Sequence, residues 1–317
     1  MIMKPNVLIT SIAAKIPLIK QVRSALERNG HFGRIIGADA DENVIGAYFV
    51  DEFWLMEPIC AWEISTFVSS CKERNIHAII PTREGDLPFF SEHLMTLRAH
   101  EIYTMVSAQE AVQVCMDKWH FYEKVISWGI PVIPTYRSVD EAGRNRIVIK
   151  ERRGSGSRGV TVNVDAAEAL TYVAKMSDPL IQPFISGKEF SIDLYVDCVG
   201  EVKGVVVRER VLVVRGESQI SRTLSHPLLE ELCIRLVKKL GIYGHAVVQA
   251  FEQEDGTVLI IECNARFGGA STLGIRAGVD SFYWFLLESR GESLASLPVI
   301  KCNQTVTMVR HNEDIWL

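Results

Sequence analysis

The sequence predicts an α/β domain with a parallel sheet, followed by an α+β unit in two parts. In the first third of the chain, short apolar strands alternate with amphipathic helices, which implies a parallel sheet with helices on its faces. From about residue 146 the order changes to strand, glycine-rich turn, strand, helix and strand. An apolar segment then leads to Asp255-Gly256, a strong signal for an antiparallel hairpin.

The N-terminal domain begins with a short apolar strand at residues 6–10. Residues 16–28 have helical periodicity, and Gly30 is the expected helix terminator. The remaining elements expected in this domain are strands at residues 33–37 and 78–81 and a helix at residues 61–74. Further along the chain, the periodicity predicts helices at residues 117–128 and 228–240.

Polar residues follow these strands at the end where parallel sheets bind ligands. This rim comprises Ser11, Asp39, Arg83 and Glu84. An acidic residue after the second strand is also typical of dinucleotide-binding domains. However, residues 10–14 lack the Gly-x-Gly-x-x-Gly loop that brings a backbone close to a pyrophosphate. The sequence therefore argues against a dehydrogenase with a nicotinamide cofactor.

The composition is that of an ordinary globular protein. The 317 residues suffice for more than one domain, and 48% hydrophobic with 23% charged residues is the usual balance. A net charge of -5 gives no reason to expect nucleic-acid binding, and no apolar stretch is long enough to cross a membrane. The start of the chain lacks a signal-peptide pattern, and the seven cysteines include no Cys-x-x-Cys pair. We therefore expect a cytoplasmic protein with reduced thiols.

A hairpin tip rich in glycine and serine follows the strand expected at residues 147–150. The strand ends at Lys150, and the tip contains Gly154, Ser155, Gly156 and Ser157. Glycine lets backbone amides turn inward and serine adds hydroxyl donors, so the tip can fold over a triphosphate as a flap. Lys150 favours this interpretation because a desolvated lysine needs an anion. The alternative is a flexible surface turn.

The next apolar strand breaks at Pro183, which leaves its backbone edge free to bind an adenine. In the segment Gln182-Pro183-Phe184-Ile185, two apolar side chains lie beside that edge. Glu189 follows at a distance where its carboxylate could accept hydrogen bonds from ribose hydroxyls. The alternative is an ordinary strand with a kink.

The strand after Asp255-Gly256 carries three polar residues in alternation. Side chains two apart on a strand point the same way, so Glu262, Asn264 and Arg266 lie on one face. Oxygen donors beside a fixed cation suit a hard metal ion and a phosphate. Cys263 lies between them and is expected to point to the opposite face, into the core.

The hairpin adds a further oxygen donor from the preceding strand. If Asp255 and Gly256 form a two-residue turn, counting outward places Gln249 directly opposite Glu262 on the same face. The three oxygen-bearing side chains Gln249, Glu262 and Asn264 are then within reach of bound Mg²⁺. The alternative is an amphipathic hairpin whose polar face is only solvated.

Taken in order, these motifs resemble those of the ATP-grasp superfamily, and most closely its carbamoyl-phosphate-synthase-like members. The resemblance covers essentially the whole chain. It implies a pre-ATP-grasp domain at residues 1–112, a small lid subdomain at residues 113–185 and a large subdomain with the metal site at residues 186–317. Asp117-Lys118 resembles the start of the ATP-grasp unit, where a lysine contacts phosphate.

The resemblance also implies a role for each motif. Lys118 and Lys150 contact the phosphates of ATP, and Arg266 steadies the phosphate that is transferred. The other implied nucleotide contacts are Gly154, Ser155, Gly156, Ser157, Gln182, Pro183, Phe184, Ile185 and Glu189. The implied metal ligands are Gln249, Glu262 and Asn264, which would hold two Mg²⁺ ions, with Mn²⁺ as an alternative.

The implied reaction is the ATP-dependent joining of a carboxylate, such as an amino acid or a small carboxylic acid, to an amine. The carboxylate attacks the γ-phosphate to give an acyl phosphate, and the amine then displaces phosphate, so that ADP and phosphate are released. The implied catalytic residues are Arg266, Lys150 and Arg208, with Arg208, Arg210 and Arg215 as candidates for holding the substrate carboxylate. The partners are small-molecule substrates, and a homodimer remains open.

Two features depart from the family pattern: residues 11–15 lack glycines, and the segment after Arg266 is short. Residues 268–271 could open a helix whose amide end binds an anionic substrate, or they could be a plain helix start. His226 and His245 show no spacing for a metal or a nucleophile, and we interpret both as structural.

Two other functions compete with the ligase. One is a carbamoyl-phosphate-type or kinase-like phosphoryl transfer, although the chain shows neither paired synthetase halves nor a glutaminase. The other is a regulatory protein that binds ATP without turnover. A pure ATP-binding protein need not keep all of the following residues, which favours the enzyme: Lys118, Lys150, Glu262, Asn264 and Arg266.

Overall fold

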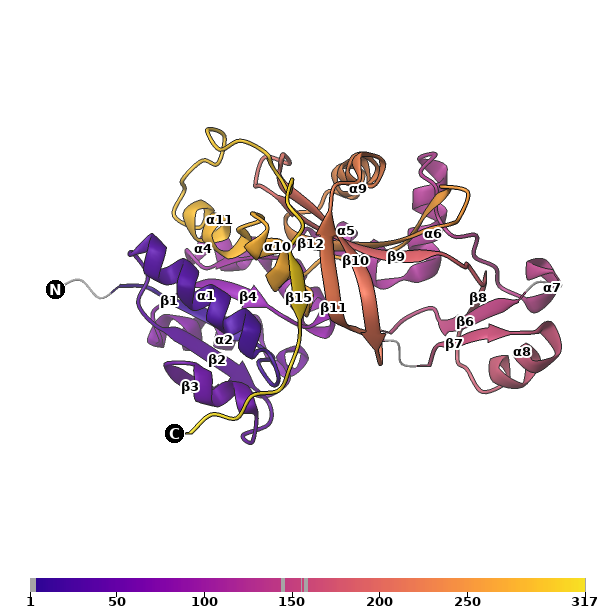
Figure 1. Cartoon of the computed structure of the whole chain (residues 1–317). Helices are drawn as coiled ribbons and strands as arrows, with labels where there is room; N and C mark the ends of the chain where they lie inside the picture. Colours follow the sequence, from indigo (N-terminus) through magenta and orange to yellow (C-terminus); the bar gives the residue numbers. More distant parts are fainter. Residues whose placement is uncertain (1–3, 144–145, 155, 157–158, 317) are drawn as a thin grey trace.

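The computed structural model describes residues 4–143, 146–154, 156 and 159–316. Within them the strands form a five-stranded, a seven-stranded and a three-stranded sheet. Figure 1 shows the N-terminal sheet at one end, the large sheet in the middle and the small sheet at the other end. The predicted fold class, a parallel-sheet domain followed by an α+β unit in two parts, is confirmed.

The N-terminal sheet is parallel throughout, with the strand order β3-β2-β1-β4-β5. Its strands are β1 (Asn6–Thr10), β2 (Ile35–Asp39), β3 (Glu52–Leu55), β4 (Ile76–Pro81) and β5 (Tyr103–Thr104). Its helices are α1 (Ile16–Asn29), α2 (Ile64–Glu73), α3 (Leu87–Glu92) and α4 (Leu94–Ala99), with 3-10 helices η1 (Ile45–Phe49), η2 (Ile59–Ala61) and η3 (Glu84–Asp86). As predicted, α1 ends at Gly30, whose φ of 71° suits glycine.

The large sheet has the order β13-β12-β9-β10-β11-β15 and is antiparallel except where β14 pairs with β10. Its strands are β9 (Lys188–Val196), β10 (Val202–Val214), β11 (Glu217–Leu224), β12 (Gly244–Glu252), β13 (Val258–Asn264), β14 (Ile300–Lys301) and β15 (Thr307–Val309). Its helices are α9 (Pro227–Leu240), α10 (Thr272–Arg276) and α11 (Ser281–Glu288). Gly187 lets β9 begin beside β12, because a Cβ there would lie 2.1 Å from the carbonyl oxygen of Glu252.

The small sheet has the order β7-β6-β8 and is antiparallel. It consists of β6 (Ile147–Glu151), β7 (Thr161–Val164) and β8 (Pro179–Pro183), with helices α7 (Val139–Ala142) and α8 (Ala166–Val173). Two helices precede it, α5 (Gln109–Met116) and α6 (Lys118–Ser127). Phe121 and Val125 of α6 pack in the core of the large sheet rather than against the small one. The domain limits at 112 and 185 stay predictions.

One hydrophobic core is shared by the N-terminal sheet and the large sheet. Val22 of α1, Tyr195 of β9 and Phe282 of α11 are buried together in it. The small sheet has a separate core that includes Ile149 and Ile181. We therefore call the N-terminal and large sheets with their helices the body, and the small sheet with α7 and α8 the lid.

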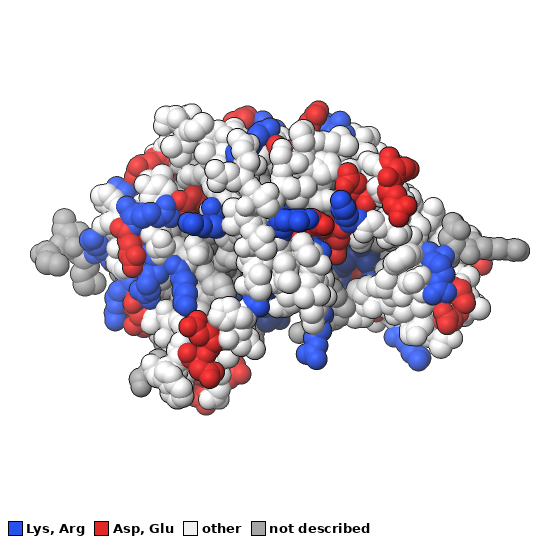
Figure 2. Space-filling model, viewed as in Figure 1, with Lys and Arg blue, Asp and Glu red and all other residues white. Residues whose placement is uncertain are grey.

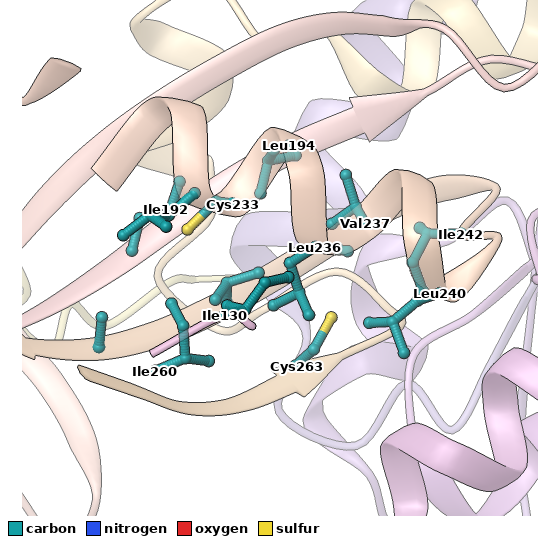
Figure 3. Close-up of a cluster of buried hydrophobic side chains, with 14 of the residues drawn as sticks. Ile130, Ile192, Leu194, Cys233, Leu236, Val237, Leu240, Ile242, Ile260 and Cys263 are labelled. Carbon is teal, nitrogen blue, oxygen red and sulfur yellow. The ribbon is translucent and has the colours of Figure 1, made fainter. Parts of the chain in front are cut away.

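The hairpin β12–β13 packs its apolar face against α9. Figure 3 shows Ile260 and Cys263 of β13 facing Cys233 and Leu236 of α9. Cys263 is 1% exposed, so the prediction that it points into the core is confirmed. The opposite face of the hairpin is therefore left for the polar residues.

The outer surface carries no large field of one sign on the face drawn in Figure 2, where basic and acidic side chains are interspersed. None of the described helices is long and apolar enough to cross a membrane. All seven cysteines are free thiols.

Candidate active site

A cavity of about 650 Å³ lies where the lid, the large sheet and the rim of the N-terminal sheet meet. Its wall includes residues from all three, so no single domain forms the site. From the lid come Lys150, Gly154, Gly156, Gln182 and Pro183, and from the large sheet come Glu189, Arg208, Gln249, Glu262 and Asn264. From the rim come Ser11, Lys15, Asp39, Arg83 and Glu84. Nearly every residue predicted for the site thus lines one cavity.

The hairpin places Gln249 opposite Glu262, as predicted, but by a different route. The two-residue turn is wrong, because Gln253 and Glu252 pair with Thr257 and Val258, which leaves three residues in the loop. A β-bulge at Ile261 then shifts the register by one and restores the predicted pair. The one-residue error in the predicted turn is thus compensated by the one-residue bulge, which was not predicted.

The polar residues of β13 form a hydrogen-bonded row that reaches the N-terminal domain. The Asn264 side-chain amide donates to Glu262 Oε1 over 3.1 Å, and Arg266 donates to Asn264 Oδ1 over 3.4 Å. Beyond them, Arg266 forms a 2.7 Å ion pair with Glu84, which follows β4. The row therefore connects the predicted metal ligands to the rim.

The three predicted metal ligands fit Mg²⁺ that is held mainly by a nucleotide. They offer one carboxylate and two amides, and no group of three His, Cys, Asp or Glu that could bind a metal occurs among the described residues. Mg²⁺ usually takes one or two protein carboxylates and completes its shell with phosphate and water oxygens. The donor set suits an ion that arrives with phosphates.

Two lysines also line the cavity, Lys150 from the lid and Lys118 from the start of α6. Lys150 on β6 is 6% exposed, and burial lowers its pKa to about 8, with Glu262 opposing and Lys118 adding to the shift. Lys118 Nζ donates to the carbonyl of Gly154 over 2.7 Å. Burial deprives the Lys150 ammonium of stabilising water. A bound anion would stabilise the charged form instead, so the site favours anion binding.

The base of the flap is fixed by Asp117. Its side chain caps α6 by accepting from the amides of Trp119 and His120, and it forms ion pairs with Arg152 and Arg153. Burial alone would raise the pKa of Asp117, but the bonds from Arg152 and from the His120 amide outweigh it and hold the pKa at about 2. Gly154 and Gly156 line the cavity, while Ser155 and Ser157 lie outside the described residues.

The adenine segment differs in part from its prediction. β8 ends at Pro183, but the amide of Phe184 is not free, because it donates to the carbonyl of Arg146 over 2.8 Å. The Gln182 side chain donates to Thr135 over 2.8 Å. Phe184 and Ile185 still line the cavity, so base contacts there stay a prediction.

Glu189 and Arg210 form a pair at the large-sheet wall. Arg210 Nη1 donates to Glu189 over 2.6 Å, and its other nitrogens donate to Ser218 and to the carbonyl of Gly216. Burial raises the pKa of Glu189, and the charge of Arg210 opposes that shift. Arg210 is thus committed to positioning Glu189.

Of the three candidate arginines, Arg208 lines the cavity and keeps a buried donor that has no partner in the described part of the chain. Its Nε and Nη2 bind Asp193, while the buried Nη1 has no partner among the described residues. Arg215 instead lies exposed in the turn between β10 and β11, outside the cavity wall.

Asp193 binds further residues in addition to Arg208. It accepts from Ser271, whose hydroxyl in turn accepts from the amide of Gly268, and it lies near His245. Gly274 is required beside it, since a Cβ there would lie 2.6 Å from the Asp193 carboxylate. His245 is buried and bonded to Ser281, and His226 caps α9, so a structural role for both stays the prediction.

Sequence reasoning missed Lys15 and Arg310, which line the cavity, and Asp193, which binds the cavity residue Arg208. Lys15 lies just past β1, where the rim argument could have found it. Asp193 lies in an apolar strand, and its alternation with Ser191 was a usable signal. Arg310 follows β15, and no local pattern marks it because its neighbours Glu217 and Gly269 are distant in sequence.

The fold and cavity define a class: a parallel-sheet domain fused to a large antiparallel sheet with a lid, all three facing one polar cavity. Residues 115–270 match the ATP-grasp domain family, and residues 7–106 match the PylC-like N-terminal domain family. The chain is thus a member of the ATP-grasp superfamily, as predicted. A search of curated proteins found no significant match.

Solved structures share this fold at low identity. The biotin carboxylase of Campylobacter jejuni, in a β,γ-ATP complex, is 17% identical with a TM-score of 0.75, over 95% of this chain and 74% of that one. The biotin carboxylase domain of Hydrogenobacter thermophilus 2-oxoglutarate carboxylase, with MgADP and bicarbonate, is 18% identical with a TM-score of 0.75, over 97% and 74%. The N5-carboxyaminoimidazole synthetase of Staphylococcus aureus, with ADP, is 15% identical with a TM-score of 0.74, over 98% and 83%.

Proposed function

We propose that the protein is an ATP- and Mg²⁺-dependent ligase that joins a carboxylate to an amine through an acyl phosphate. The observation that carries the proposal is the arrangement of Glu262, Asn264 and Arg266 opposite Lys150 in one cavity. Side-chain oxygens that could bind a metal ion thus lie near a buried lysine that could bind a phosphate. Phosphoryl transfer needs both kinds of group close together. The nucleotides in the related structures support the same site.

In this proposal the triphosphate lies between the lid and the β12–β13 hairpin. Lys118, Lys150 and Arg266 neutralise its charge, and Gly154 and Gly156 close over it from the flap. Glu189 contacts the ribose, and the segment Gln182–Ile185 contacts the base. Gln249, Glu262 and Asn264 would hold two Mg²⁺ ions, with Mn²⁺ as an alternative, and bound Mg²⁺ would supply charge neutralisation at the β- and γ-phosphates.

The chemistry proceeds in two balanced steps. A carboxylate oxygen of the acid attacks the γ-phosphorus, the bond to the β-phosphate oxygen breaks, and ADP leaves. The amine nitrogen then attacks the acyl carbon, inorganic phosphate leaves, and one proton is lost from nitrogen. In this proposal Arg208, whose guanidinium is fixed by Asp193, binds the carboxylate of the acid, and the flap excludes the water that would hydrolyse the acyl phosphate.

The test is product analysis with MgATP and a panel of acids and amines. We expect ADP and phosphate, and with an acid labelled by ¹⁸O in its carboxylate we expect one ¹⁸O in the released phosphate. AMP and pyrophosphate would refute the acyl-phosphate route. Tight ATP binding without turnover by any pair would favour the regulatory protein instead.

A carboxylation through bicarbonate is the second candidate. It is favoured by the structurally similar carboxylases, one of which was solved with bicarbonate. Bicarbonate in the same assay distinguishes the two: carboxylation requires bicarbonate and incorporates its carbon into the amine product, whereas the ligase turns over with an organic acid alone.

A further inference from the structure

Three basic residues from distant parts of the chain meet in the cavity beyond the end of β13. Lys15 follows β1, Arg266 follows β13 and Arg310 follows β15, and all three line the same wall. The Arg310 guanidinium contacts the carbonyl of Gly269, three residues after Arg266. Burial lowers the pKa of Lys15, and the charges of Arg266 and Arg310 lower it further, while Glu217 and Asp86 oppose the shift, so Lys15 lies within electrostatic reach of both arginines.

The acidic residues nearby are occupied elsewhere. Glu84 pairs with Arg266 over 2.7 Å, and Glu217 pairs with Arg310 over 3.0 Å. Asp86 accepts hydrogen bonds from the hydroxyls of Thr10 and Ser11. In the part of the chain that the structure describes, Lys15 forms no ion pair. Gathering like charges costs free energy, and an anionic ligand would offset that cost.

The loop that carries Lys15 is held rigidly, even though it lacks the glycines of the family pattern. Ser11 adopts a left-handed φ of 54°, which is strained for a residue other than glycine, and its hydroxyl donates to Asp86 over 2.7 Å. Asp39 accepts from the amide of Ala13, and Thr82 donates to the carbonyl of Ser11. Side-chain hydrogen bonds therefore replace glycine in fixing the loop, and they preset Lys15 toward the cavity.

Two residues of the cluster, Lys15 and Arg310, are not among the proposed nucleotide contacts. Along β13 and the segment after it the order is Glu262, Asn264, Arg266, and then Gly269, which contacts Arg310. Lys15 and Arg310 therefore lie past Arg266 on the side of the N-terminal rim, whereas Lys150 faces Glu262 from the lid. The cluster is placed to receive the molecule that approaches the acyl group from the rim.

Resting on the proposed ligase function, we propose that the substrate that supplies the amine is an amino acid whose carboxylate is bound by Lys15 and Arg310. The same positive charges also favour the reactive form of that substrate. A cation near an ammonium group destabilises its protonated form, and the neutral amine is the nucleophile. The cluster would thus both hold the acceptor and help to deprotonate it.

The test compares amino acids of both configurations with their primary amides as acceptors, each with MgATP and the acid panel. We expect the wild type to prefer the amino acid roughly tenfold to a hundredfold in kcat/KM, the range for one or two charged hydrogen bonds. Lys15→Met and Arg310→Gln should raise the KM of the amino acid and remove the preference over the amide. The KM of ATP should stay unchanged.

Arg222→Gln is the matched control, because Arg222 is an ion-paired arginine on β11 that lies outside the cavity wall. It should change neither the acceptor KM nor the preference. ADP-forming turnover that is indifferent to the acceptor carboxylate and to Lys15 would overturn this inference and leave the ligase standing. No ADP-forming turnover with any pair would overturn the ligase, and this inference with it.

Discussion

At the scale of single residues, Lys150 offers the sharpest test of the nucleotide site. Its pKa is lowered to about 8 by burial, so in the free protein its charge is present below pH 8 and is lost above it. A lowered lysine pKa also means that the buried charge destabilises the free protein below pH 8, and that this penalty fades as the pH rises toward 10.5. Bound phosphate should reverse the shift.

We therefore expect the affinity for a non-hydrolysable ATP analogue to fall as the pH rises above about 8, by up to about tenfold per pH unit. Calorimetry in buffers of different ionisation enthalpy should detect proton uptake on binding in the same range. Lys150→Arg should flatten the profile, since arginine stays protonated. A wild-type affinity that is constant to pH 9.5 would show that Lys150 does not contact the phosphates.

Glu262 is the single carboxylate among the proposed metal ligands, so its removal should be severe. Glu262→Ala should lower Mg²⁺-dependent kcat roughly a hundredfold or more, in the range seen when one electrostatic stabiliser is lost. Glu254→Ala, at the exposed tip of the same hairpin, is the control and should be neutral. Full activity of Glu262→Ala, with circular dichroism showing an intact fold, would contradict the metal assignment.

Site residues could be predicted from the sequence where a pattern of neighbouring residues marks them. They could not be predicted where their role depends on contacts with distant parts of the chain. Glu262, Asn264 and Arg266 follow from strand alternation, which needs no knowledge of the fold. Arg208 was one of three candidates, and what separates it from Arg210 is the set of partners that each guanidinium binds. Such distinctions depend on partners far apart in the sequence.

At the scale of elements, the β12–β13 hairpin shows how a local rule can fail and still give the right pair. Asp255-Gly256 suggested a two-residue turn, but Gly256, with a φ of 82°, closes a three-residue loop instead. The bulge at Ile261 adds the compensating residue. Bulges depend on packing against neighbouring elements, here α9 and the nearby strands, so the sequence of one hairpin does not reveal them.

The base of the flap is held by the ion pairs of a single residue, Asp117. Asp117→Asn should loosen it, because the ion pairs to Arg152 and Arg153 are lost together. We expect a severalfold higher KM for ATP, and faster hydrogen exchange in residues 150–160, measured by mass spectrometry. Asp140→Asn, on the exposed helix α7 of the lid, is the control. Unchanged exchange in residues 150–160 would rule out Asp117 as the anchor.

The pH dependence of this anchor has the opposite sign to that of Lys150. The pKa of Asp117 is lowered to about 2, below its usual 3.8. The stabilisation that its ionised form gives is therefore complete above about pH 4 and is lost as the pH falls toward 2. The anchor is fully formed across the neutral range in which the site would work.

At the scale of the whole molecule, the body and the lid are separate parts. The core shared by the N-terminal and large sheets lies in the body, and the lid has a core of its own. The spacing of apolar residues and the turn residues predicted the parallel sheet, the strand–turn–strand lid and the hairpin, because helices and strands differ in that spacing. They gave no sign that α11 would close a core with α1, which lies more than 200 residues away in sequence. That packing fuses the N-terminal and large sheets, so the rim that carries Lys15 is held fixed against β13.

This division predicts two kinds of response to core truncation. Phe282 is fully buried in the shared core and lies 4.6 Å from Phe267, ring centre to ring centre. Phe282→Ala should therefore destabilise the body by about 3–5 kcal/mol, and β1 and β12 should lose hydrogen-exchange protection together. Ile181→Ala, in the lid core, should raise exchange only in residues 147–183, and saturating MgATP should restore much of that protection because the nucleotide binds both parts. If Phe282→Ala exposed β12 but left β1 protected, the two sheets would be independent units, and Lys15 would no longer be held in place against Arg266.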